Sequence, residues 1–281
     1  MEETNHMINS SRRIYIRIGQ YHLSFSTIDA ENSETPVTYE PYVVKSNMSI
    51  AANLREALKG AGLKQMGIVR ALVILDTPVL LVPVEVFEEQ TMADMYYHSF
   101  PKKEQEQVLY NVLPDLNAVA VFSINKDLKL VLDDHFADVK FSVVMASVWR
   151  HLHRRSFSGA RNKLYGYFHD QKLEIFSFQQ NRFKFYNRFD THREQDALYF
   201  LLYVWKQLSL KNEHDELHLV GSNFASDTQA DNDKQKWLTD ELHRYLQNVY
   251  VINPSAEFNR APVTSIKGMQ FDLMALFTKG R

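Results

Sequence analysis

The start of the chain alternates apolar and polar side chains in a way that predicts a β-meander. In IYIRI, residues 14–18, isoleucine occupies every second position. The alternation resumes in HLSFSTI after Gly19 and Gln20, and a period of two on both sides of a glycine-containing turn is typical of a β-hairpin. The segment VTYEPYVV, residues 37–44, predicts a third strand.

A helical period follows in MSIAANLREALKGAG. Leu54 lies among apolar residues spaced three and four apart, with Ser49 as a candidate cap and Gly60 as a candidate end. The amphipathic stretch EQEQVLYNVLPDL, residues 104–116, is also interpreted as a helix. Elsewhere in the first half, strands are predicted within 67–87 (two), 117–124 and 139–143, and helices over 126–136 and 143–155.

The second half repeats this order. Three strands are predicted within residues 163–189, followed by helix, strand, helix and strand, with a last short helix at 271–277. The openings of the two halves also align: IYIRIGQYHLSF lies over LYGYFHDQKLEI, which matches Tyr15 with Tyr165 and Leu23 with Leu173. Long internal periods indicate duplication, and helices interleaved with strands indicate mixed sheets with helix-covered faces.

Composition narrows the class of protein. The chain has 281 residues, 45% of them hydrophobic, no cysteine and a formal net charge of −2, so we expect a globular protein without disulfides or thiolate metal sites. Neither nucleic-acid binding nor direct membrane insertion is expected, because no global basic excess exists and the most apolar run is broken by Asp76, Pro78 and Pro83. We expect a cytoplasmic location, since no signal-peptide core is found near residue 1.

A Ser/Gly-rich stretch, SFSGARN, is the best candidate for a boundary between the halves. The expected organisation is a disordered N-terminus over 1–11, a first lobe over 12–157 and a second lobe over 158–281.

This element order resembles the actin-like fold, the superfamily that includes actin, sugar kinases and the PilM and FtsA proteins. The stretches LLVPVEVF and MYYHSF further resemble an uncharacterised Bacteroidetes family, DUF3822. The resemblance implies an α/β, ribonuclease H-like, duplicated fold with two lobes. It also implies a cleft between the lobes, where active members hold ATP and Mg²⁺ with the aspartate and glycine of a hairpin from each half.

Several residues of this sequence fall at the positions that the resemblance assigns to the nucleotide cleft. They are Gly19, Gln20, Asp170, Gly221 and Ser222. The site is degenerate: Arg17 stands at or near the position of the metal-linked aspartate, and the second hairpin, YFHDQ, has no glycine beside its aspartate. Because Mg²⁺ prefers oxygen ligands, we expect no catalytic residue, no bound metal and no cofactor, with ATP and Mg²⁺ kept as an alternative.

Three further clusters contain residue types that are common in binding sites. WRHLHRRS, residues 149–156, is either a phosphate or nucleic-acid contact or a helix end carrying cations. LDDHFAD, residues 132–138, offers metal-ligand types but is interpreted as a solvated helix end. The two histidines of NEHDELH, residues 212–218, are not expected to converge.

The leading hypothesis is therefore a non-catalytic binding or scaffold module with an unknown protein partner. One alternative is an active ATPase or small-molecule kinase of the actin-like superfamily. The other is a PilM-like component of a membrane-associated complex.

Overall fold

The computed structural model describes residues 13–28, 37–60, 68–157, 159–180, 182–221 and 229–278. The expected disorder over 1–11 falls outside this range. The described chain forms two compact units: Met1–Leu113 with Ala118–Ala146, and Pro114–Asn117 with Ser147–Arg281. The division passes through helix α5 (Val144–Ser156), whereas the sequence suggested a boundary after that helix, at 157.

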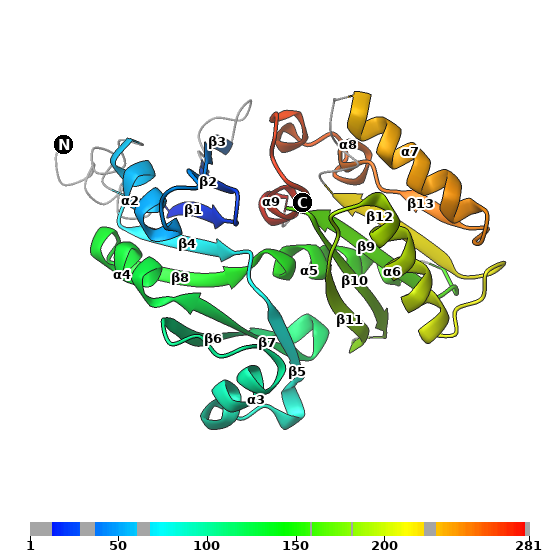
Figure 1. Ribbon diagram of the computed structural model, residues 1–281, viewed down its shortest axis with the longest axis horizontal. Coiled ribbons are helices and arrows are strands. Elements are labelled where there is room, and N and C mark those ends of the chain that lie inside the picture. Colours follow the sequence, from blue (N-terminus) through cyan, green and yellow to red (C-terminus); the bar gives the residue numbers. More distant parts are fainter. Residues whose placement is uncertain are drawn as a thin grey trace. The chain divides into compact units, whose positions relative to one another are not determined.

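The main sheet of the first unit has five strands in the order β3-β2-β1-β4-β8. Strands β1, β2 and β3 form an antiparallel meander, and β4 and β8 continue the sheet in parallel with β1. The elements are β1 (Arg13–Ile18), β2 (His22–Ile28), β3 (Val37–Val43), β4 (Arg70–Leu75), β8 (Asp138–Val143), α2 (Ile50–Gly60) and α4 (Lys126–His135) (Figure 1).

Helix α2 forms as its sequence predicts. Ser49 Oγ accepts a hydrogen bond from the backbone N–H of Ala52 at 3.2 Å, which satisfies one of the donors left open at a helix start. Leu54 is fully buried, so the apolar stripe of the helix faces the core of the first unit.

A second, smaller sheet in the first unit has the order β5-β7-β6 and packs against α3. These elements are β5 (Val79–Pro83), β6 (Glu106–Leu113), β7 (Ala118–Asn125) and α3 (Met92–Ser99). The helix predicted over 104–116 is wrong, because β6 pairs with β7 along its whole length. The apolar residues of this segment fit a period of two as well as a spacing of three or four, so the sequence pattern alone allows either a strand or a helix. Pairing with β7 selects the strand.

The second unit repeats the main sheet, in the order β11-β10-β9-β12-β13. Strands β9, β10 and β11 are the antiparallel meander, and β12 and β13 run parallel to β9. The predicted duplication is confirmed, since both sheets have the same strand order and directions. The strands are β9 (Lys163–His169), β10 (Lys172–Gln179), β11 (Arg182–Asp190), β12 (Glu216–Gly221) and β13 (Val249–Val251).

The two faces of this second sheet differ in chemistry. Helices α6 (Glu194–Gln207) and α7 (Gln229–His243) cover one face with an aliphatic core that includes Leu201, Leu219 and Leu242. The other face contacts α5 and α9 (Phe271–Phe277): Tyr167 donates a hydrogen bond to Asp272 Oδ1 at 2.8 Å, and Ser147 donates one to the Asp272 carbonyl at 2.7 Å. The buried polar residues Lys163, Glu174 and His218 lie on this face, since strand register places them beside Tyr165 and Tyr167.

Candidate functional site

Both predicted hairpin turns form, and they have the same length. In the first unit, the N–H of Gly19 donates to the carbonyl of His22 at 2.9 Å, which leaves Gln20 exposed at the turn. In the second unit, His169 pairs with Lys172, so that Asp170 and Gln171 form a two-residue turn. Strand register therefore aligns Gly19 with His169, and Gln20 with Asp170.

The second turn uses a strained backbone without glycine. Asp170 and Gln171 have φ angles of 44° and 60°, which is the left-handed pattern of a type I′ hairpin turn. Aspartate tolerates this region better than glutamine does. The turn is therefore closed by side-chain-bearing residues where active relatives are expected to present glycine.

Arg17 occupies the interior of the first unit. Its residue is 1% exposed, and it lies opposite Ser24 on β2 near the end of β1. A guanidinium has five donors and no acceptor, so it provides no ligand atom for Mg²⁺.

Gly221 is required by the packing of the second sheet. It has φ +135°, and a Cβ built on it would lie 2.0 Å from the carbonyl oxygen of Phe168. Gly221 also pairs with Phe168, two residues before Asp170, so that Gly221 and Asp170 lie at the same edge of the sheet. Ser222 falls outside the described residues.

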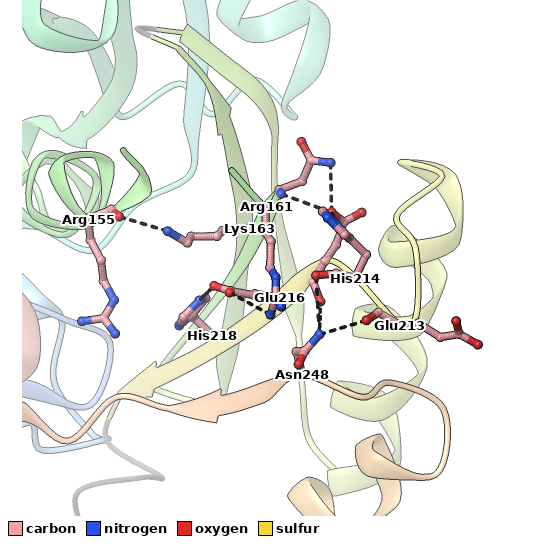
Figure 2. A network of polar contacts seen from close by, with 10 residues as sticks. Arg155, Arg161, Lys163, Glu213, His214, Glu216, His218 and Asn248 are labelled. Carbon is pink, nitrogen blue, oxygen red and sulfur yellow. Dashed lines mark hydrogen bonds and ion pairs between the residues drawn. The ribbon is translucent and has the colours of Figure 1, made fainter. Parts of the chain in front are cut away.

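A polar network, which the sequence did not predict, joins the starts of β9 and β12 (Figure 2). Asp215 accepts hydrogen bonds from the N–H of Lys211 at 2.8 Å and from the backbone and side-chain nitrogens of Asn162 at 3.2 and 3.1 Å. Burial alone would raise the pKa of Asp215, but these bonds and one from His214 hold it below its usual value. The network fastens the loop before β12 to the start of β9.

Lys163 and His218 extend this network into the interior. Lys163 pairs with Glu216 across the strands, and its Nζ donates to the carbonyl of Arg155 at 3.3 Å. His218 donates from Nε2 to Glu216 Oε2 at 3.0 Å. Both residues are buried, and burial lowers the pKa of Lys163 and that of His218.

The basic end of α5 turns inward and contacts the short helix α8 (Pro254–Glu257). His151 donates to Glu257 Oε1 at 2.8 Å, and Arg155 forms an ion pair with the same carboxylate. Burial would raise the pKa of Glu257, but His151 and Arg155 outweigh that effect and lower it. His153 donates to the carbonyl of Gln180 at 3.0 Å. Three of the five basic side chains of WRHLHRRS therefore serve internal contacts.

A second buried cluster lies near the β9–β10 turn. Glu174 is fully buried and accepts hydrogen bonds from His169 at 3.1 Å and from Tyr186 at 2.9 Å, with Arg188 Nε at 3.6 Å. The sequence carried a signal for both clusters, because Lys163, Tyr165, Tyr167 and His169 alternate with apolar residues or glycine along β9. That pattern indicates a strand with one polar face. In the structure, helices α5 and α9 cover this polar face.

The clusters LDDHFAD and NEHDELH serve structural contacts. In LDDHFAD, Asp133 pairs with Lys129, Asp138 with Arg70, and His135 bonds the carbonyl of Val131. In NEHDELH, His214 contacts Asp215 whereas His218 contacts Glu216, so the two histidines use different carboxylates.

The repeated mixed sheets with their helices define an actin-like fold. The chain is similar to a protein of Bacteroides thetaiotaomicron VPI-5482 with an actin-like ATPase fold and unknown function, with 25% identity, a TM-score of 0.77, and coverage of 93% of this chain and 98% of that one. It is also similar in fold to a chain of the PilM–PilN type IV pilus biogenesis complex, with 11% identity, a TM-score of 0.58, and coverage of 96% and 99%.

The particular family is shown by sequence. The chain belongs to the family described as "Protein of unknown function (DUF3822)", whose model matches residues 2–249. No curated protein matches the chain significantly. Among the described residues, no helix has the length and apolar character needed to cross a bilayer.

Proposed function

We propose that this protein is a non-catalytic binding or scaffold module with a degenerate nucleotide cleft. The observation that carries the proposal is in the first hairpin, where the buried Arg17 stands at or near the position that the resemblance assigns to the metal-linked carboxylate. A fixed cation there repels Mg²⁺. In phosphoryl transfer the metal neutralises the charge that develops on the phosphates, so its exclusion removes the main source of catalysis.

The second unit supports the same proposal. Gly221 is explained by the close approach of β12 to Phe168, so its presence needs no nucleotide. Asp170 lies in a turn whose second residue is Gln171 rather than glycine. Gln20 is the exposed turn residue of the first hairpin. Gly221, Asp170 and Gln20 therefore each have a local structural role.

The partner is proposed to be a protein. The fold similarity to a chain of the PilM–PilN complex extends over 96% of this chain. This similarity favours a second candidate function, a PilM-like component that binds another protein. The remaining alternative is an active ATPase or small-molecule kinase. The following measurement distinguishes that alternative from the scaffold module and from the PilM-like component.

The test is the binding of ATP, with and without Mg²⁺, by isothermal titration and by thermal unfolding. A ligand present at 100 times its dissociation constant stabilises the folded state by about 2.7 kcal/mol, which is about 5–11 °C for a chain of this size. We expect no heat of binding and no shift at millimolar ATP. An Mg²⁺-dependent shift that is lost in Asp170→Asn, and kept in the control Asp240→Asn, whose residue is exposed on α7, would refute the proposal.

A further inference from the structure

His218 is enclosed in the second unit by two aromatic rings. Its imidazole stacks between Tyr165, at 5.4 Å, and Tyr250, at 5.1 Å, and its side chain is 5% exposed. A carboxylate only accepts hydrogen bonds, so the contact with Glu216 places the ring proton on Nε2. Nδ1 then carries a lone pair, and this buried atom has no hydrogen-bond partner among the described residues.

Charged and titratable groups face this ring from every neighbouring element. They are Glu216 on β12, Lys163 and Tyr165 on β9, Arg155 on α5, Tyr250 on β13 and Glu257 on α8. Glu216 already accepts the Nε2 proton when the ring is neutral. A second proton, on Nδ1, would therefore add a buried positive charge beside Arg155 and Lys163, and the described part of the chain offers no acceptor for its N–H.

The same two cations hold the last turn of α5. Lys163 donates to the carbonyl of Arg155, and Arg155 binds Glu257 together with His151. Figure 2 shows Lys163 reaching from β9 to the Arg155 carbonyl, with His218 on the neighbouring strand. We propose that protonation of His218 releases the C-terminal half of α5 from the sheet of the second unit, which makes this helix an acid-operated latch.

The direction follows from the two protonation equilibria. Burial, with Arg155 and Lys163, lowers the pKa of His218 in the closed form, whereas hydration in an open form returns it to the ordinary value of 6.5. The open form therefore binds more protons, and opening is favoured as the pH falls below about 6.5. Because the closed form takes up a proton less readily than the open form, the opening constant rises as the pH falls from 7.5 to 5.5, by at most about tenfold.

Hydrogen exchange of the whole protein, read by mass spectrometry and corrected for intrinsic rates, tests the proposal. Peptides that cover residues 147–157 should show more opening at pH 5.5 than at 7.5, by at most about tenfold. Peptides from α6, on the opposite face of the sheet, should not. This pH-dependent increase in α5 opening should disappear in His218→Gln, because glutamine keeps a donor for Glu216 but does not titrate. The increase should persist in the control His192→Gln, whose residue is exposed.

Two further outcomes decide between neighbouring explanations. His151 lies on the same helix and contacts Glu257 rather than His218, so the pH-dependent increase in opening should persist in His151→Gln. If it vanishes in His151→Gln and survives in His218→Gln, the assignment to His218 is overturned. Should His218→Gln not fold, the wild-type comparison still decides, because equal increases in α5 and α6, or none in α5, contradict a local latch.

Discussion

The replacement of Gly221 by alanine should damage this protein far more than the same change at other glycines. A Cβ at this position would lie 2.0 Å from the carbonyl oxygen of Phe168, 2.7 Å from its nitrogen and 2.8 Å from its carbonyl carbon. All three atoms belong to the backbone of β9, the central strand of the sheet, so no side-chain rotation relieves the contact. The φ angle of +135° adds conformational strain for any L-residue.

The magnitude can be built from the two contributions. Holding an alanine in a sparsely populated backbone region costs about 1–3 kcal/mol, and overpacking a tight interior typically costs a further 1–3 kcal/mol. Because backbone and not side chain must move here, we expect a total of about 4 kcal/mol or more. A loss of this size approaches the total free energy of unfolding of a marginally stable domain.

The other glycines provide a graded control series for denaturant unfolding. Gly159→Ala has φ +80° but no atom within 4 Å, so only strain is expected, about 1–2 kcal/mol. Gly166→Ala would meet the side-chain ends of Leu219, Leu201 and Leu173 at 3.0–3.3 Å, so about 1–3 kcal/mol of crowding is expected. Gly60→Ala meets nothing within 4 Å and should be close to neutral. A Gly221→Ala protein as stable as Gly159→Ala would refute the close approach of β12 to β9.

Three other predictions follow from named contacts, each checked by equilibrium unfolding. Leu54→Ala should lose about 2–5 kcal/mol, because the residue is fully buried, and a loss below about 0.5 kcal/mol, usual for exposed sites, would show that the helix face is misassigned. Gln171→Gly should gain about 0.5–1 kcal/mol by removing strain at φ 60°; a loss would mean that the exposed side chain stabilises the turn. Glu257→Gln should be destabilised near neutral pH, where the wild-type carboxylate is charged in both states. Since folding lowers the pKa of Glu257, this difference should shrink as the pH falls from about 4.5 through the folded pKa, and a pH-independent difference would contradict a charge-based contribution.

The sequence by itself determined the repeating elements of the fold. Alternation around Gly19 and the helical stripe around Leu54 are local patterns, and they gave the meander and α2 because a period of two or 3.6 is fixed by backbone geometry. The duplication was visible for the same reason, since Tyr15 and Tyr165 occupy equivalent places in β1 and β9.

Tertiary structure decided what depends on partners distant in the sequence. Residues 106–113 became a strand because β7 offers them a ladder of pairs, which no local pattern contains. The basic end of α5 turned inward because Glu257, far along the chain, accepts from His151 and Arg155. The resemblance assigns Gly221 to the nucleotide cleft, but only the structure shows how closely this residue approaches the backbone of Phe168. Pairing, burial and close approach are properties of two segments at once, so a single stretch of sequence cannot specify them.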